Sequence, residues 1–545
     1  MKVKKKTKKN DFYSEAKSFL ALVDTGIIYA FLFCMLGIFP LFYENAYQGI
    51  GNVKYALFAK TSRFFLIVEI VLIIVRICLI ISQYFKGESI DYVVDELKKR
   101  SFLDKAVAVY GICVIISFLL CDNMSFAFEG ADGWNMGLYS QLVFVGIYFL
   151  ISWRYQLLEG ILKVHLFSSA IVFILGILHR FQIDPLGMYE GLAMHLKVSF
   201  LSTLGQSSWY SSYMCTVFFV GIIIFYLSKE KKLRIWTGIY TVLCFAIFVV
   251  QNSDSAYMAM VGILLLLGYF SLENKERWLR FIQLIAMMFG TFAGMGILQK
   301  IFAARMVPLE SLSIFFSQSI FTWIILAISI GLYFLFKNLN DEKMQKFLKM
   351  FRKIYKLVPV LLVLGIVGMS VFIYLNTKGY LLQWFGFQSS NMYLYFSDMW
   401  GNRRGFNWSI ALEAYAGFPF INKLYGIGPD SFSAYLYSVP ELAEKLRSYY
   451  PTLTLTNAHS EYINSLVCYG VVGLAAWITV LVGGIVYFYR KAKEEPFMIA
   501  FALCIMGYAC HNIFCYQQVC CTPFLFIALG IGESLTKDEN FNTIK

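Results

Sequence analysis

The chain has 545 residues, of which 59% are hydrophobic and 15% are charged, and its formal net charge is +13. A soluble protein of this length needs far more charge to cover its surface, so the composition excludes an ordinary soluble fold. We expect no nucleic-acid partner, because the lysines and arginines lie beside hydrophobic runs and do not form one basic block.

Hydrophobic runs of about twenty residues recur along the whole chain, and each can cross a hydrocarbon core of roughly 30 Å. The lysine-rich start, residues 1–10, precedes a full-length run and predicts a retained anchor. We therefore predict an all-α, polytopic transmembrane bundle of about 14 spans. The predicted spans lie near residues 18–43, 64–85, 106–121, 138–153, 161–179, 208–228, 235–250, 255–272, 281–299, 317–337, 357–376, 461–488, 496–512 and 519–534.

Clusters of lysine and arginine fall between alternate spans, which predicts that they share the cytoplasmic side. This arrangement places both termini in the cytoplasm. The clusters are at residues 2–9, 98–100, 229–234, 275–280, 337–356 and 490–491. The loops left on the outer face are 44–62, 122–136, 180–207, 300–316 and 377–458.

The outer loop 377–458 is the longest polar segment of the chain. It divides the sequence into three parts: residues 1–376 with eleven spans, the large extracytoplasmic loop 377–458, and residues 459–545 with three spans and a short cytoplasmic tail. A polar segment of this length, held at one face of a bilayer, indicates where chemistry on a membrane-anchored substrate takes place.

Two residues of this region point to group transfer. Arg404 is a fixed positive charge that can hold a diphosphate through paired hydrogen bonds, and Arg403 precedes it. His459, which we expect in the first turn of the next span, titrates near neutral pH and can take a proton from a hydroxyl. Trp408 offers an aromatic face for a sugar.

Each of these residues also has a structural interpretation. Arg404 could form a salt bridge within its loop, and His459 could cap or pack against a helix. Gly470 and Gly473 are expected to allow close packing of a neighbouring helix. The sequence contains no HExxH, phosphate-loop lysine or DxD pattern, so it predicts neither a metal nor a nucleotide cofactor.

These residues, taken in order, resemble the O-antigen ligase and O-antigen polymerase family of bacterial membrane glycosyltransferases. The resemblance covers roughly residues 200–490 and is weakest at Ser202–Gln206. The motifs that carry it are Arg404 with Trp408, Gly426-x-Gly428 with Phe432, and His459-Ser460 followed after nine residues by Gly470-x-x-Gly473.

One position departs from the family pattern. Many members have arginine in a Ser-Arg-x-x-x-Leu sequence, whereas this chain has Asp254 in the place of the arginine. If the family arginine contacts the donor, another cation must replace it here. The outer-face cations available for this are Arg403, Arg180, Lys197 and Arg305.

The resemblance implies a GT-C-like enzyme in the bacterial cytoplasmic membrane that uses a glycan on undecaprenyl diphosphate and needs no metal or other cofactor. Arg404 would hold the diphosphate, and His459 would activate an acceptor hydroxyl, with inversion at the anomeric carbon. Arg403, Trp408, Asp254, Glu461, Arg180 and Arg305 are further candidate substrate-binding residues, and Gly426, Gly428, Gly470 and Gly473 are structural.

The acceptor, a glycan or glycolipid, remains open: it is another lipid-linked repeat in a polymerase and a different anchor or a protein in a ligase. A polymerase would work beside a flippase and a chain-length regulator. The alternative function is a transporter of lipid-linked oligosaccharide. A transporter is expected to show internal repeats and charges deep in the membrane, and this chain shows no evident repeat and few such charges.

Overall fold

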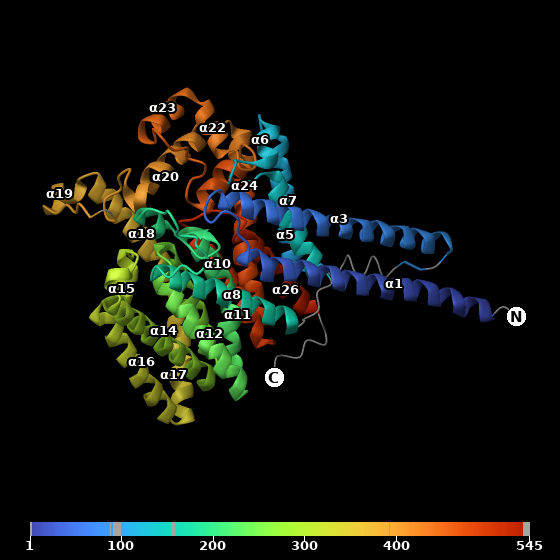
Figure 1. The fold of residues 1–545 in the computed structure, drawn as a ribbon, viewed down its shortest axis with the longest axis horizontal. Helices are drawn as coiled ribbons and strands as arrows, with labels where there is room; N and C mark the ends of the chain where they lie inside the picture. The colour runs from blue at the N-terminus through green and yellow to red at the C-terminus, as the bar shows by residue number, and fades with distance from the viewer. Residues whose placement is uncertain (1–2, 88, 91–99, 154–158, 392, 538–545) are drawn as a thin grey trace.

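The computed structural model describes residues 3–87, 89–90, 100–153, 159–391 and 393–537. Within these residues the chain is almost entirely helical (Figure 1). Eleven of the described helices are long and apolar enough to cross a membrane. The all-α, polytopic class is therefore confirmed, whereas the number of spans stays a prediction, because the predicted runs 138–153, 496–512 and 519–534 form shorter helices.

The first half of the chain forms long helices joined by short turns, and one small antiparallel sheet pairs Phe200 with Gln206. Ser101 and Asp104 form a reciprocal cap at the start of α5. The elements are α1 (Val3–Leu32), η1 (Phe33–Ile38), α2 (Phe39–Leu41), α3 (Ile50–Phe85), α5 (Phe102–Leu119), α6 (Met124–Glu129), α7 (Leu138–Ser152), α8 (Glu159–Arg180), α9 (Met194–Ser199), β1 (Phe200–Leu201), β2 (Gly205–Gln206), α10 (Ser207–Val217), α11 (Phe219–Leu227) and α12 (Lys231–Val250).

The second half contains the polar segment between two long helices. Asn274 and Asn340 cap α14 and α17 by accepting hydrogen bonds from backbone N–H groups. The elements are α13 (Asp254–Ser271), α14 (Lys275–Ile301), η2 (Ala303–Arg305), α15 (Ser311–Gln318), α16 (Ile320–Asn338), α17 (Asp341–Tyr355), α18 (Val358–Thr377), α19 (Tyr380–Phe385), α20 (Trp400–Ala416), α21 (Phe420–Tyr425), α22 (Phe432–Ser438), α23 (Pro440–Tyr449), α24 (Glu461–Lys491), η3 (Pro496–Met498), α25 (Ile499–His511) and α26 (Thr522–Lys537).

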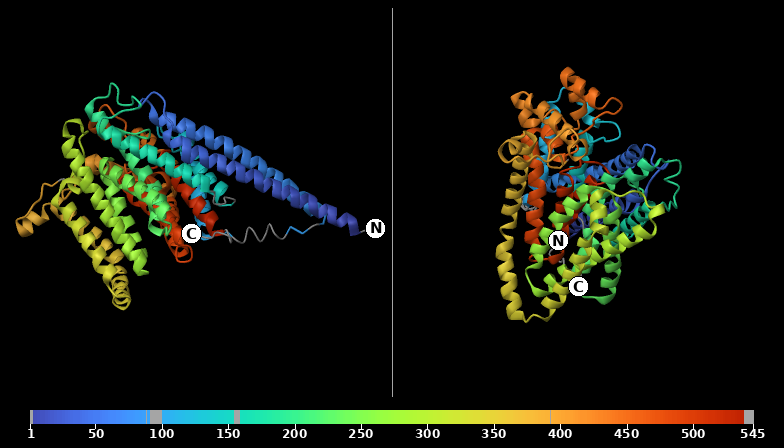
Figure 2. Two further views of the ribbon diagram at one scale, coloured as in Figure 1. Left: turned by 60° about the horizontal axis from the view of Figure 1, so that its bottom comes forward. Right: turned by 90° about the vertical axis from the view of Figure 1, so that its left-hand side faces the viewer.

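Helix α24 lies at the centre of the carboxy-terminal half, where it packs against α5, α25 and α21. Its Trp477 is fully buried and lies beside Tyr110 of α5 and Phe526 of α26. In contrast, α18 lies at the edge of the bundle, and its apolar side chains are exposed (Figure 2, right). Such exposure is expected of a helix that faces lipid.

The loops predicted to share the outer face contact one another at one end of the bundle. Tyr47 donates to the Ser202 carbonyl oxygen at 2.8 Å, and Asn252 donates to the Pro308 carbonyl oxygen at 2.9 Å. The short helices α19 to α23 cap this same end (Figure 2, right). The polar segment is thus folded into helices, and we refer to residues 377–458 as the cap.

The loops predicted to be cytoplasmic meet at the other end. Lys275 donates to the Leu339 carbonyl oxygen at 2.7 Å, and Lys537 pairs with Asp104 at 3.0 Å. Lys2, Lys98 and Lys99 of the predicted basic clusters lie outside the described residues. These contacts join segments that the charge pattern predicts to be cytoplasmic, and the side of the membrane that each end faces stays a prediction.

Candidate functional site

His459 lies immediately before α24 and not in its first turn as we expected. The helix begins at Glu461 with Ser460 as its N-cap residue. The His459 backbone is left-handed, with φ 53°, which is uncommon for a residue with a side chain. Its N–H donates to Asn457 Oδ1 at 3.0 Å. The turn of Asn457 therefore holds the histidine in this conformation.

The surroundings of the His459 ring favour its neutral form. The ring is half-buried and packs edge-on against Tyr516, with 5.3 Å between ring centroids. Burial lowers the pKa of His459 to about 4, and the positive charge of Arg404 also lowers it. Nδ1 lies 3.3 Å from the Asn457 carbonyl oxygen. When Nδ1 carries the proton, Nε2 has a free lone pair and can accept one.

Arg404 is fixed by backbone oxygens and not by a carboxylate. Its Nε and Nη2 both donate to the Phe514 carbonyl oxygen, at 3.2 and 2.8 Å, and Nη1 donates to the Gly401 carbonyl oxygen at 2.6 Å. These bonds use three of the five guanidinium N–H groups and leave two. Among the described residues, no carboxylate lies within salt-bridge distance of Arg404, so its charge is not paired directly.

The chain reaches Arg404 through a strained turn. Gly401, Asn402 and Arg403 all have positive φ, at 56°, 59° and 67°, within the residues of α20. A left-handed conformation costs roughly 1–2 kcal/mol for a residue with a side chain. The Arg403 side chain is exposed, and its guanidinium lies 5.7 Å from the Tyr450 ring centroid.

Trp408 lies one helical turn beyond Arg404 and packs on the loop that contains Phe514, the residue whose carbonyl oxygen holds Arg404. Its ring stacks on Phe514, with 5.9 Å between centroids and 11° between planes. Trp408 therefore supports the loop whose carbonyl holds Arg404, and this contact leaves its role toward a sugar as a prediction.

Glu461 is buried and joins α24 to the loop between α25 and α26. Its backbone N–H donates to the Asn512 carbonyl oxygen at 3.1 Å, and its carboxylate accepts hydrogen bonds from the Asn512 and Gln517 side chains. Asn512 is linked in turn to His511 at 3.1 Å. We call residues 512–521 the support loop, because it contacts Arg404, Glu461 and, through Tyr516, His459.

Asp254 begins α13 close to this site. The charges of Asp254 and Arg404 are near enough to interact, although they do not form a salt bridge. The next residue, Ser255, is hydrogen-bonded to His511 Nε2 at 2.9 Å. Glu310 precedes α15. Burial raises the pKa of Glu310, and the negative charge of nearby Asp254 also raises it. The position that departs from the family pattern therefore faces the region of Arg404.

Within the described residues, the guanidinium groups of two other predicted cations, Arg180 and Arg305, form no hydrogen bond with Arg404, His459 or the support loop. Arg180 is fully buried, and its guanidinium donates to the carbonyl oxygens of Val250, at 2.7 Å, and Lys197, at 2.7 Å. It holds the loops after α8 and α12 together, so we leave it out of the proposed substrate contacts. Arg305 in η2 is exposed, and its carbonyl oxygen accepts a hydrogen bond from Gln182.

Gly470 interrupts α24, which differs from the simple helix packing that we expected for it. Its φ is 67° and its ψ is −175°, so the regular helical hydrogen bonds stop here. The freed carbonyl oxygens of Val467 and Cys468 accept hydrogen bonds from the N–H groups of Ile427, at 3.3 Å, and Gly428, at 3.1 Å. A Cβ at Gly470 would lie 2.3 Å from backbone atoms of Leu424.

The Gly426-x-Gly428 motif supplies the matching surface. A Cβ at Gly426 would lie 2.1 Å from the Cys468 carbonyl oxygen, so only glycine allows this approach. Gly473 faces Tyr469 of its own helix and Cys113 of α5. Nearby, Asp430 is buried and accepts hydrogen bonds from the Ala131 and Met136 N–H groups at 2.8 and 3.0 Å, and burial raises its pKa to about 7. The two glycine motifs therefore form one backbone junction beside the site.

Sequence reasoning missed the support loop. Phe514, Tyr516 and Gln517 contact the predicted residues, yet none of the three was among the predicted site residues. The signal available was Gln517 and Gln518, two polar residues in the short stretch between the predicted spans 496–512 and 519–534. Phe514 acts through its carbonyl oxygen, which no residue pattern reveals.

The comparison with protein families bears directly on this geometry. Residues 306–478 match the O-antigen ligase family. The match includes Arg404, His459 and both glycine motifs, and it confirms the resemblance to the O-antigen ligase and polymerase family. Asp254, Arg180 and the support loop lie outside the matched residues of this O-antigen ligase domain. No curated protein shows a significant match to the chain.

Proposed function

We propose that this integral membrane protein is a glycosyltransferase of surface polysaccharide. It transfers a glycan from undecaprenyl diphosphate to a hydroxyl of an acceptor glycan or glycolipid, at the outer face of the bacterial cytoplasmic membrane. The O-antigen ligase domain supports the class of reaction. The observation that carries the proposed chemistry is the proximity of Arg404, which forms no ion pair with a described residue, to His459, whose pKa is lowered by burial and by the Arg404 charge.

Arg404 is suited to the donor diphosphate. Its guanidinium keeps its charge at any physiological pH, and two N–H groups remain after its bonds to Phe514 and Gly401. Because those bonds fix the guanidinium plane before substrate arrives, little reorganisation is needed when negative charge develops on the leaving group. Arg403, exposed beside it, is the second cation of the proposed diphosphate site.

His459 is suited to the acceptor. The acceptor oxygen attacks the anomeric carbon, the bond from that carbon to the diphosphate oxygen breaks, and the electron pair leaves with undecaprenyl diphosphate. His459 Nε2 takes the hydroxyl proton as the new glycosidic bond forms. Attack opposite the leaving group inverts the configuration. The donor is already activated as a diphosphate ester, so the proposed reaction requires no metal or nucleotide.

Glu461 and Asp254 have supporting roles in this proposal. Glu461 fixes the support loop through Asn512 and Gln517, and thereby fixes Tyr516 against His459. Asp254 lies near Arg404 and limits how far its guanidinium can shift toward other anions. With a polymerase acceptor, a flippase would deliver the donor and a chain-length regulator would set product length.

The decisive experiment compares lipid-linked glycans from cells that carry wild type, His459→Ala or Arg404→Ala at equal protein levels. Loss of long polymer with single repeats accumulating on the carrier identifies a polymerase. Accumulation of full-length lipid-linked polymer identifies a ligase. Unchanged products in both variants contradict the proposed enzyme and favour the transporter of lipid-linked oligosaccharide.

A further inference from the structure

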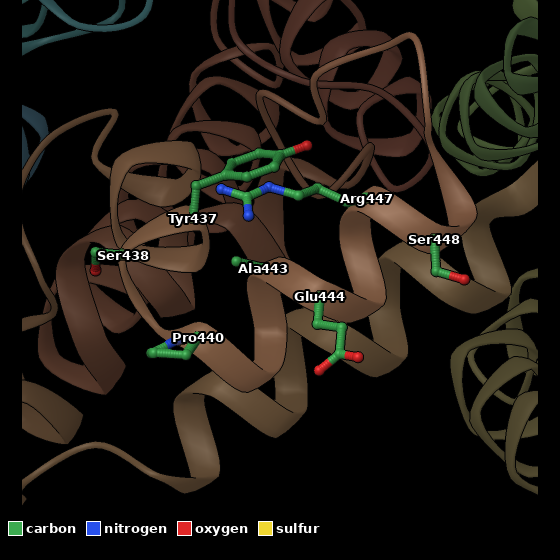
Figure 3. A pocket seen from close by; sticks show the side chains of 7 residues that line it. All are labelled: Tyr437, Ser438, Pro440, Ala443, Glu444, Arg447 and Ser448. Atoms are coloured by element: carbon green, nitrogen blue, oxygen red, sulfur yellow. The ribbon is translucent and has the colours of Figure 1, made fainter.

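The cap carries an open groove between α22 and α23, formed by residues other than those of the candidate site. Its volume is about 710 Å³. Figure 3 shows Tyr437 and Arg447 at one side of the groove, with the Arg447 guanidinium beside the tyrosine ring, and Glu444 at the other side. The hydroxyls of Ser438 and Ser448 also line it.

The two charged side chains of the groove, Arg447 and Glu444, form no ion pair within the part of the chain that the structure describes. Both side chains are exposed. On the same helix, Lys445 is paired with Glu413 at 2.6 Å. On α23, the charge that points toward α20 is therefore paired, whereas the charges of Glu444 and Arg447, which line the groove, form no ion pair with a described residue.

This set of groups matches the chemistry of a sugar chain. A sugar ring has an apolar face of C–H groups, which packs on an aromatic ring, and an edge of hydroxyls, which need both donors and acceptors. Tyr437 offers the ring, Arg447 offers donors, and Glu444 offers acceptors. A purely anionic ligand fits less well, because the Glu444 carboxylate would repel it.

The groove is connected to the candidate site through the backbone of the cap. Tyr437 Oη accepts a hydrogen bond from the Leu455 N–H at 3.3 Å, four residues before His459. At the end of α23, Tyr449 stacks on Phe406, with 3.9 Å between centroids, and Tyr450 donates to Asn407 at 2.9 Å. The segment that forms the groove thus contacts the chain on both the His459 side and the Arg404 side.

We propose that this groove binds a saccharide segment of the acceptor glycan, several sugars away from the hydroxyl that reacts. This inference rests on the proposed function. It assigns a second glycan contact to the cap, so that a long acceptor is held by sugars that take no part in the transfer itself. Binding there raises the affinity for extended acceptors and leaves the chemistry at His459 unchanged.

The test uses the full-length protein in detergent micelles. The probe is the oligosaccharide repeat, released by mild acid from the lipid-linked glycan of the producing cells, and binding is measured by saturation-transfer NMR. We expect Arg447→Ala to weaken binding about tenfold or more, because it removes charge-assisted hydrogen bonds. Tyr437→Ala should weaken binding, whereas Tyr437→Phe keeps the ring and should bind nearly as wild type.

Glu441→Ala, an exposed change in the first turn of α23 outside the groove, is the matched control and should bind as wild type. Wild-type affinity in both Arg447→Ala and Tyr437→Ala, or no binding of the repeat by wild type, overturns the groove assignment. His459→Ala separates the two proposals: it should bind the repeat as wild type and transfer nothing. Retained transfer in His459→Ala rejects the proposed function, while the groove is judged on affinity alone.

Discussion

The guanidinium of Arg404 makes two hydrogen bonds to a single oxygen, the carbonyl of Phe514, from Nε at 3.2 Å and from Nη2 at 2.8 Å. A carbonyl dipole orients the cation but leaves its charge in place. A carboxylate in the same position would neutralise that charge. The arginine of the cap is thereby positioned by a loop that follows it by 110 residues.

Lysine should not replace Arg404. The lysine ammonium is a point charge and cannot present two parallel N–H groups to one carbonyl while also facing a substrate. We expect Arg404→Lys to lower kcat by about 10- to 100-fold, as loss of an oriented charge contact in a transition state does. Initial rates with purified donor in proteoliposomes measure this. As a control, Lys445→Ala removes an exposed ion pair of the same cap and should retain full activity. A wild-type rate in Arg404→Lys contradicts the proposed role of the oriented guanidinium.

The pH dependence of transfer should report the neutral state of His459. Its pKa is about 4 because of burial, and a general base works in its unprotonated form. The rate should therefore stay constant from about pH 8 to about pH 5 and fall as pH approaches 4, where the ring gains its proton. Samples returned to neutral pH must recover their rate, which excludes unfolding. An inflection near the ordinary histidine value of about 6.5 contradicts a buried base.

Glu461→Gln should reduce turnover without unfolding the protein. The carboxylate accepts from two amide groups, and a glutamine must direct its own NH₂ group at one of them. One buried hydrogen bond becomes a donor–donor contact, which costs about 1–3 kcal/mol. We expect a roughly tenfold lower kcat with KM nearly unchanged. Rescue by a second change, Gln517→Glu, which restores an acceptor opposite the new donor, distinguishes loop positioning from direct catalysis by Glu461.

Gly470→Ala should destabilise the protein. Its left-handed backbone disfavours a side chain, and the new Cβ would lie 2.3 Å from the backbone of Leu424. We expect a loss of about 2–5 kcal/mol, the sum of the conformational cost and the overpacking. Thermal melting in detergent measures the change. Gly368→Ala in α18, where a Cβ meets nothing within 4 Å, is the matched control and should melt as wild type.

Most of the helices could be predicted from hydrophobic runs, because backbone groups in lipid must bond within a helix. The break at Gly470 could not, because a glycine inside an apolar run looks the same whether it allows packing or a left-handed turn. The hydrogen bonds that compensate this break come from Ile427 and Gly428, more than forty residues earlier in the sequence, and no local pattern shows that distance in sequence.

The candidate site was predictable only in its charged residues. Arg404 and His459 stand out because one carries a fixed positive charge and the other titrates near neutral pH, in a polar segment beside hydrophobic spans. The groups that hold them do not stand out in the sequence. Arg404 is held by the Phe514 carbonyl oxygen, and every residue has a carbonyl oxygen. Arg180 also has partners that the sequence does not reveal: an isolated cation beside an outer loop suggests substrate binding, and its guanidinium donates to the Val250 and Lys197 carbonyl oxygens.

The support loop also has a consequence for biogenesis. Arg404 and His459 leave the ribosome well before Phe514 and Asn512, which hold Arg404 and Glu461. During synthesis the cap therefore emerges first, and its contacts with the support loop form only after α25 and the loop that follows it have been made. The loop between α25 and α26 completes this arrangement, so a nascent chain that stalls before it contains Arg404 and His459 without the contacts that hold them.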